Sequence, residues 1–213
     1  MEKIKSLRAS AALAVAVLLT TCLIGGTFAK YTTAAAGNDS VRVAHWGFDQ
    51  TNTINLDGLF STMYSNVKSS NGQDVMAPGT EGSASFGFAY NESHADAPEV
   101  NYTFNVAVTE NCDAAIRNNP AIRFKLDAGT FGTWEDLVAD IKALSGDATG
   151  SKAYAAGTLP TAFPKTDTVH TISWKWDFQD GTAAQDTMDT TMGTAASLDS
   201  LNLAVSITAT QID

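Results

Sequence analysis

Histidine side chains are the first residues of this chain that could do chemistry. His45, His94 and His170 stand far apart, and no His-Glu-x-x-His segment places two imidazoles on one helix face to bind zinc. The sequence also lacks a Gly-x-Ser-x-Gly nucleophile turn and a phosphate-binding glycine loop. We therefore predict no catalytic residue, no metal site and no cofactor, and we expect His45 and His170 to be ordinary strand residues.

Acidic side chains gather at three places where they could hold a metal ion weakly. Glu92 and Asp96 flank His94, and the segments 110–113 and 186–189 each carry two acids that could attract calcium. Neither of these two segments has the regular oxygen spacing of an EF-hand loop. Two acids brought together by the fold could also hydrolyse a glycosidic bond, but nothing singles out a pair. Solvated surface charge is the preferred interpretation.

Aromatic and sulfur-containing residues offer two further possibilities. Trp174 and Trp176 fall on one face of an alternating segment and could form a stripe that stacks on carbohydrate, although such tryptophans are more often part of a core. Cys112 is interpreted as a small, half-buried residue without a catalytic role. Because it is the one cysteine beyond residue 22, the sequence does not indicate a disulfide framework.

The first 29 residues have the three parts of a secretory signal peptide. Lys3, Lys5 and Arg8 precede an apolar run from Ala9 to Ile24, and Thr27 and Ala29 supply the small side chains at positions −3 and −1 of a cleavage site before Lys30. An uncleaved anchor helix is the first alternative, but a membrane span normally needs about 20 apolar residues. A lipoprotein is the second, since residues 19–22 loosely match a lipobox. We predict cleavage after Ala29 and no stable membrane anchor afterwards.

The charge of the remaining chain is strongly negative. The full sequence has a net charge of −10, and removal of three basic residues and one acid with the leader leaves 10 basic and 22 acidic residues, a net charge of −12. This balance disfavours nucleic acid and anionic membrane surfaces as partners. About 184 residues remain, a length that suits one domain with its own core.

Short segments of alternating apolar and polar residues predict at least six strands, each with one solvent-exposed face. Such strands indicate antiparallel sheets stacked on a shared core, and we predict a mainly β fold, a β-sandwich or jelly roll. The expected buried residues include Val41, Val43, Trp46 and Phe48 in the first strand and Phe178 at the end of the fifth. The predicted strands are 40–48, 83–90, 99–109, 121–126, 168–178 and 201–212.

Two segments have helical spacing instead and are expected to pack as short side helices. In the first, Thr133 is a plausible N-cap, acids follow in the first turn, and apolar residues recur from Trp134 to Leu144. The second runs from Leu56 to Val67 and is weakened by Gly58. Pro78-Gly79 predicts a tight turn. The segments 145–164 and 180–200 are expected to be turn-rich or exposed connections.

Several of these segments resemble the TasA/camelysin family of exported bacterial proteins. Residues 25–31, Gly-Gly-Thr-Phe-Ala-Lys-Tyr, resemble the junction that a SipW-type signal peptidase cleaves. Residues 40–48 are similar to the family's first strand, and residues 77–83, Ala-Pro-Gly-Thr-Glu-Gly-Ser, to the turn before its next strand. Residues 172–178 and 207–211 are similar to its closing strands.

This resemblance implies a jelly-roll protein secreted into a biofilm matrix, at or outside the cell surface, where it forms fibres. It divides the chain into a signal peptide (1–29), an N-terminal donor-strand segment (30–40) and a jelly-roll domain (41–213). The donor segment would add to a sheet of the next copy, giving a homopolymer, and would begin with Lys30, Tyr31, Thr32, Thr33, Ala34, Ala35 and Ala36. Two alternatives stay open: a camelysin-like metalloendopeptidase of the cell surface, and a monomeric adhesin or accessory protein.

Overall fold

The structure is a computed structural model in which the chain divides into two units, residues 1–42 and 43–213. It describes residue 14 and residues 41–48, 54–61, 67–68, 74–88, 97–164, 168–178, 183–195 and 200–212. Of the first unit, only residues 14, 41 and 42 belong to these ranges. The fold described below is that of the second unit.

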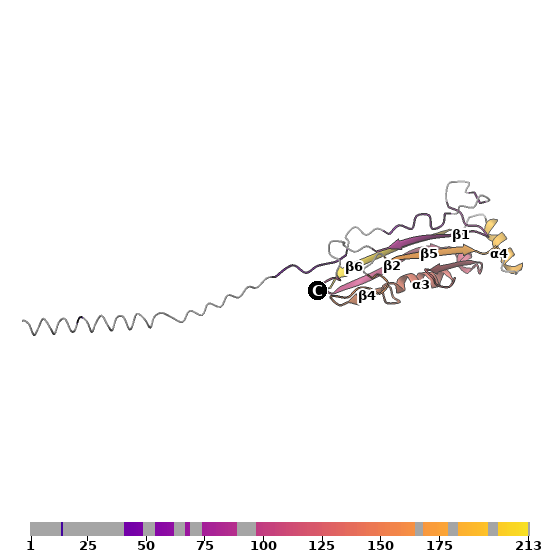
Figure 1. The fold of residues 1–213 in the computed structure, drawn as a ribbon. Helices are drawn as coiled ribbons and strands as arrows, with labels where there is room; N and C mark the ends of the chain where they lie inside the picture. The colour runs from indigo at the N-terminus through magenta and orange to yellow at the C-terminus, as the bar shows by residue number, and fades with distance from the viewer. Residues whose placement is uncertain are drawn as a thin grey trace, which may run out of the picture. The chain divides into compact units, whose positions relative to one another are not determined.

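The first sheet of this unit has three antiparallel strands in the order β1-β5-β3 (Figure 1). β1 (Glu81–Gly87) and β3 (Ile122–Leu126) lie on either side of β5 (Val169–Trp176). The turn before β1 is the predicted one, because Thr80 N–H bonds the Ala77 carbonyl oxygen at 3.0 Å. Gly79 has φ +83°, a conformation that strongly favours glycine.

The second sheet also has three antiparallel strands, in the order β4-β2-β6. β2 (Tyr102–Cys112) is the central strand and pairs along its whole length with β6 (Leu201–Gln211). β4 (Ser151–Tyr154) pairs only with the first four residues of β2. β4 was not predicted, since the segment 145–164 was expected to be a connection.

Both sheets contribute their apolar faces to one core, so the prediction of a mainly β, two-sheet antiparallel fold with short side helices is confirmed. Aromatic rings join the layers: Phe163 lies 5.6 Å from Phe104 of β2 and 4.9 Å from His170 of β5, measured between ring centroids. Trp174 and Trp176 are buried, as the core interpretation predicted. The jelly-roll connectivity stays a prediction.

The predicted helix after Thr133 is present as α3 (Trp134–Ala143). The Thr133 hydroxyl accepts from Asp136 N–H, and the Asp136 carboxylate accepts from Thr133 N–H, which completes a capping box. Trp134, Leu137 and Ile141 form its buried face, and the helix packs against β3 and β2. The apolar face of α3 therefore enlarges the core that the two sheets share.

Two further helices were not predicted. α2 (Ala114–Asn118) is a single short helix after β2. α4 (Ala183–Gly193) follows β5 and lies within the segment expected to be an exposed connection (Figure 1). Sequence reasoning missed α4 because Gln185 is its one buried residue, so the helix carries no apolar stripe.

Three other predictions are wrong within the described residues. Residues 41–47 form no strand, and Val41 and Val43 are 97% and 90% exposed, although Trp46 and Phe48 do pack on the core. Phe178 is 68% exposed because β5 ends at Trp176. Residues 57–60 form a turn rather than a helix, and residues 62–66 lie outside the described ranges. In the first two cases a local alternation of residue types continues into residues that lie outside the core.

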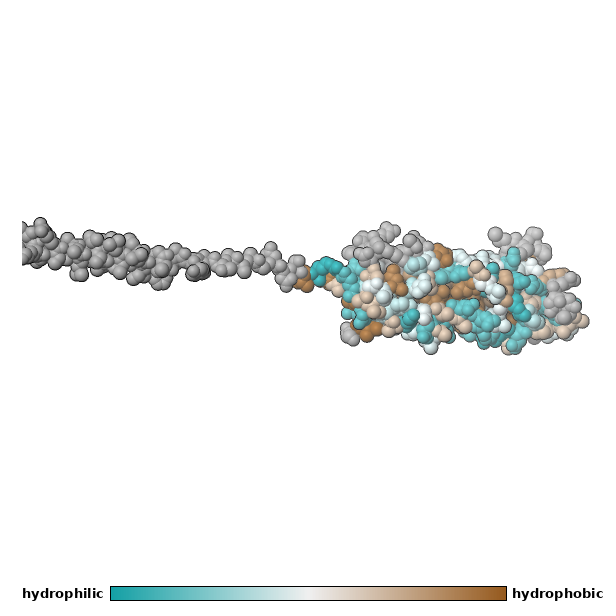
Figure 2. All heavy atoms as spheres, turned by 60° about the horizontal axis from the view of Figure 1, so that its bottom comes forward, coloured by the Kyte–Doolittle hydropathy of each residue, from teal (hydrophilic) through white to brown (hydrophobic). Residues whose placement is uncertain are grey.

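The surface of the second unit mixes polar and apolar residues, as one face shows in Figure 2. Within the described part of the chain, no helix has the length and apolar character needed to cross a membrane.

Candidate functional site

The residues predicted to carry function at the N-terminus lie outside the described residues. These are the cleavage-site residues Thr27, Ala29 and Lys30, and the donor-strand segment 30–40. The structure therefore informs the other half of the predicted interaction, which is the sheet edge that could receive an added strand.

The outer edge of β6, here called its free edge, is the longest continuous row of strand backbone groups that pair with no described segment. Two hydrogen bonds at the ends of β6 show which of its residues point their backbone groups toward β2. Ile212 N–H donates to the Asn101 carbonyl oxygen at 2.9 Å, and Asp113 N–H donates to the Ser200 carbonyl oxygen at 3.1 Å. In an antiparallel ladder such positions alternate, so the even-numbered residues of β6 bond to β2. The N–H and C=O groups of the odd-numbered residues point to the free edge: Leu201, Leu203, Val205, Ile207, Ala209 and Gln211.

The sequence of β6 carries none of the features that usually protect a sheet edge. Leu201–Gln211 contains no charged residue and no proline, and its register with β2 runs without a bulge. Val205 and Ile207 are β-branched, which favours extended backbone. A long, regular and uncharged edge is a template for pairing with another strand.

The other sheet edges are less available. β4 has four residues. β3 is covered at its centre by an isolated bridge, in which Phe124 and Gly132 exchange N–H···O bonds of 3.0 and 2.8 Å. β1 is seven residues long and carries the charged side chain of Glu81. β6 is thus the edge best suited to strand addition.

Of the histidines singled out for chemistry, His170 has clear structural partners, and His45 lies in the segment 41–47, which forms no strand. His170 is buried, with Nδ1 2.7 Å from an Asp127 carboxylate oxygen and Nε2 2.9 Å from the Ala162 carbonyl oxygen. Asp127 also accepts from Thr171 N–H at 2.7 Å, so the pair links the end of β3 to β5. His94 lies outside the described residues.

The acids near Cys112 form an ion-pair cluster rather than an open cation site. Glu110 accepts from Arg117 at 3.1 Å and from Trp134 Nε1 at 2.8 Å. Burial raises the pKa of the Cys112 thiol from 9.0 to about 11, despite the opposing effect of the Arg117 charge. Among the described residues, no group of three histidine, cysteine or acidic side chains could hold a metal ion.

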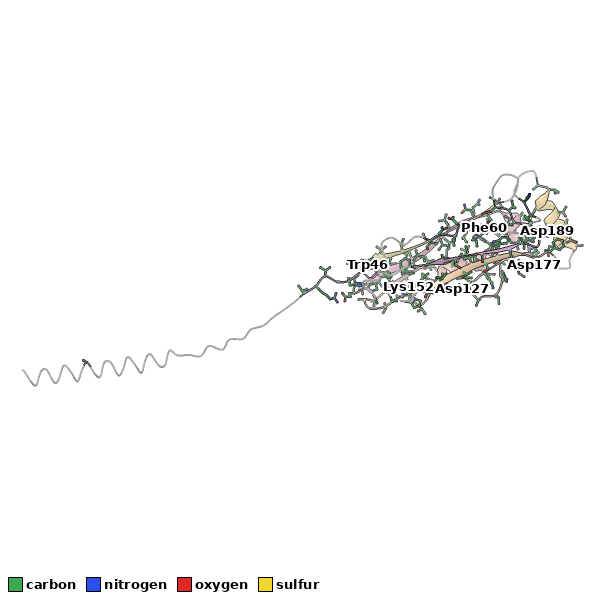
Figure 3. All side chains as sticks on the ribbon, turned by 45° about the horizontal axis from the view of Figure 1, so that its top comes forward. Trp46, Phe60, Asp127, Lys152, Asp177 and Asp189 are labelled. Atoms are coloured by element: carbon green, nitrogen blue, oxygen red, sulfur yellow. The ribbon has the colours of Figure 1, made fainter. Side chains whose placement is uncertain are left out.

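One acid of the segment 186–189, Asp189, attaches α4 to the sandwich. Asp189 Oδ1 accepts from Asn119 Nδ2 at 2.7 Å and from Trp176 Nε1 at 3.2 Å. Figure 3 shows Asp189 near Asp177, at the end of the unit where α4 lies. Asp189, which was interpreted as solvated surface charge, is therefore used for packing instead.

Comparison with known proteins gives no match: neither a protein family nor a curated sequence is similar to the chain.

Sequence reasoning located the β6 strand but not its free edge. The pairing of a strand depends on contacts with distant segments, which alternation of residue types does not encode. The one available signal was the absence of charged residues from 201–211. This signal is ambiguous, because a central strand and an unprotected edge strand can both lack charge.

Proposed function

We propose that this chain is a secreted structural protein of an extracellular matrix, which assembles into fibres by strand addition. Removal of residues 1–29 by a SipW-type signal peptidase would free the segment 30–40, and that segment would pair with β6 of the next copy. The arrangement is head-to-tail, so each added copy presents a new free edge and a homopolymer results.

The free edge of β6 is the observation that carries this proposal. Its odd-numbered residues offer an uninterrupted row of backbone donors and acceptors on an uncharged strand. Satisfying these groups with a strand from another chain gives affinity through main-chain hydrogen bonds.

The length and composition of the segment 30–40 support its role as the donor. It spans eleven residues, the same length as β6. Thr32 and Thr33 favour extended backbone, and Ala34 to Ala36 are small enough to lie against a neighbouring sheet. An attached leader would hold the segment at the membrane, and cleavage would therefore act as the assembly switch.

The test compares three purified forms: the chain from Lys30, the chain from Val41, and the chain with its leader intact. We expect fibres by electron microscopy and concentration-dependent sedimentation only for the chain from Lys30. If the chain from Val41 or the uncleaved chain polymerised equally well, the donor segment and its cleavage would not drive assembly.

Two rival functions have their own discriminating measurements. Incubation with casein, with and without a chelator, tests the metalloendopeptidase, which requires chelator-sensitive cleavage. Sedimentation across a concentration series tests the monomeric adhesin or accessory protein, which requires a constant monomer mass.

A further inference from the structure

A groove of about 780 Å³ crosses the outer face of the β1-β5-β3 sheet. Gly58 and Ser61 line it beside β1, and Phe131 lines it beside β3. Its size falls within the range of about 300–1,000 Å³ that is typical of ligand sites. The groove belongs to the sheet opposite β6, so it is separate from the proposed assembly edge.

The floor of the groove is hollow because two small residues stand side by side. Ser83 of β1 lies directly opposite Ser173 of β5, and Lys125 of β3 continues the same row. The next row along the strands carries the longer side chains of Glu81, Lys175 and Arg123. No described residue hydrogen-bonds with either serine hydroxyl, so both are available to a ligand.

The wall formed by Phe131 is held in place by two cations. Lys125 Nζ lies 4.8 Å and Lys175 Nζ 5.0 Å from the centroid of the ring. Phe131 nevertheless stays 37% exposed. An aromatic ring that is fixed and still accessible can stack on a ligand at little cost in conformational entropy.

The polar groups of the groove suit a ligand that both donates and accepts hydrogen bonds. Lys125 can only donate and the Glu81 carboxylate can only accept, whereas the serine hydroxyls can do both. A sugar ring combines hydroxyls of this dual character with a C–H face that packs on an aromatic ring. We propose that the groove binds a neutral oligosaccharide.

Two other occupants fit less well. An acidic polymer would meet the Glu81 carboxylate and a protein of net charge −10. The cations near the groove are already engaged: Lys175 pairs with Asp177, Arg123 donates to backbone carbonyl oxygens, and Lys125 lies over Phe131. An extended peptide recognised by strand pairing needs free backbone groups, but the groove lies on the face of paired strands and not at their edge. Neutral, hydroxyl-rich chains avoid both problems.

Titration calorimetry of the purified protein tests the proposal with three probes: β-1,4-linked pentamers of glucose and of N-acetylglucosamine, and an α-1,4-linked galacturonate pentamer. At least one neutral pentamer should bind with Kd on the order of 10⁻⁴ M, as expected for a shallow site. The galacturonate pentamer should bind more weakly. Failure of both neutral pentamers to bind at millimolar concentration, or preferential binding of galacturonate, would overturn the proposal.

Variants then locate the site. Phe131→Ala removes the stacking wall and should weaken binding about tenfold or more, while Ser83→Tyr fills the floor and should abolish binding with Phe131 still present. Phe178→Ala is the matched control, because it removes another exposed phenylalanine outside the groove. Equal losses in Phe131→Ala and Phe178→Ala, or unchanged binding in Ser83→Tyr, would place the sugar elsewhere and contradict the groove.

Discussion

At the scale of single residues, several ionisable side chains of the described sandwich are used for structure. Glu110 holds Arg117 and the indole N–H of Trp134, and Asp127 holds His170. These pairs satisfy groups that would be costly to leave without partners in a partly buried position. The local environments of two other residues, Cys112 and Asp136, lead to measurable predictions.

The thiol of Cys112 should be nearly inert in the folded protein. Its pKa is raised from 9.0 to about 11 by burial, so the reactive thiolate fraction at mildly alkaline pH falls about 100-fold. We expect the native protein to react with an aromatic disulfide reagent at least that much more slowly than the urea-unfolded protein, as followed by absorbance. Equal rates in the two states would mean that Cys112 is accessible.

The N-cap of α3 should make stability depend on pH in the acid range. Two hydrogen bonds from Thr133, its N–H at 2.8 Å and its hydroxyl at 2.9 Å, hold the pKa of the Asp136 carboxyl below 3.8. The folded state therefore binds the proton less tightly than the unfolded state. The stabilisation of the folded state by the ionised Asp136 carboxylate is fully present above pH 3.8. It is lost as the pH falls through the lowered folded-state pKa.

The measurement is urea unfolding of the wild type and Asp136→Asn at neutral pH and at strongly acidic pH. The variant should be less stable at neutral pH, and the difference should shrink in acid. Asp140→Asn is the control, since Asp140 is exposed on the same helix and its side chain has no hydrogen bond with a described residue. A difference that stayed constant with pH would exclude the carboxylate as its source.

At the scale of elements, the helices are attached by different means. α3 buries an apolar stripe, whereas α4 relies on polar contacts made by Asp189 and Gln185. The partners of Asp189 are themselves largely buried, because Asn119 and Trp176 both belong to the interior. Loss of the acceptor leaves Trp176 Nε1 without its partner and Asn119 Nδ2 with only the weaker acceptor Met192 Sδ at 3.4 Å.

We predict that Asp189→Ala lowers the free energy of unfolding by about 1–3 kcal/mol, the usual cost of leaving buried donors unsatisfied. Denaturant unfolding measures the change, and hydrogen exchange should show faster opening of α4. Asp186→Ala removes an exposed acid from the same helix and should have a much smaller effect. Similar effects of the two substitutions would show that Asp189 does not anchor the helix.

At the scale of the whole molecule, the proposed assembly would use one side of β6, and folding uses the other side. Ala209 directs its N–H to the free edge of β6, whereas Thr208 directs its N–H to β2. Proline lacks this N–H and is tolerated in strands mainly where the N–H faces solvent. Ala209 and Thr208 are therefore a matched pair of positions for substitution by proline.

Ala209→Pro in the chain from Lys30 should keep the domain folded and reduce fibre formation, as measured by circular dichroism and by sedimentation. Thr208→Pro should instead destabilise the domain, because it removes a hydrogen bond of the β2-β6 ladder. Fibres of normal length and yield from folded Ala209→Pro protein would rule out this edge as the acceptor.

The sequence by itself determined the class of fold, five of the strands and the helix that begins after Thr133. These features follow from alternation, helical spacing and capping, which act between residues close together in the chain. Local signals also explain the errors, since Val41 and Val43 continue the alternation of a strand but lie beyond the core.

Only the tertiary structure decided which strand is an edge, where Asp189 finds its partners, and that Ser83, Ser173 and Phe131 surround one groove. Each of these features joins segments separated by tens of residues, and strand order and register set them. The physical reason is that a backbone hydrogen bond has the same chemistry in a central strand and at an edge. Whether it is satisfied depends on what the fold places beside it.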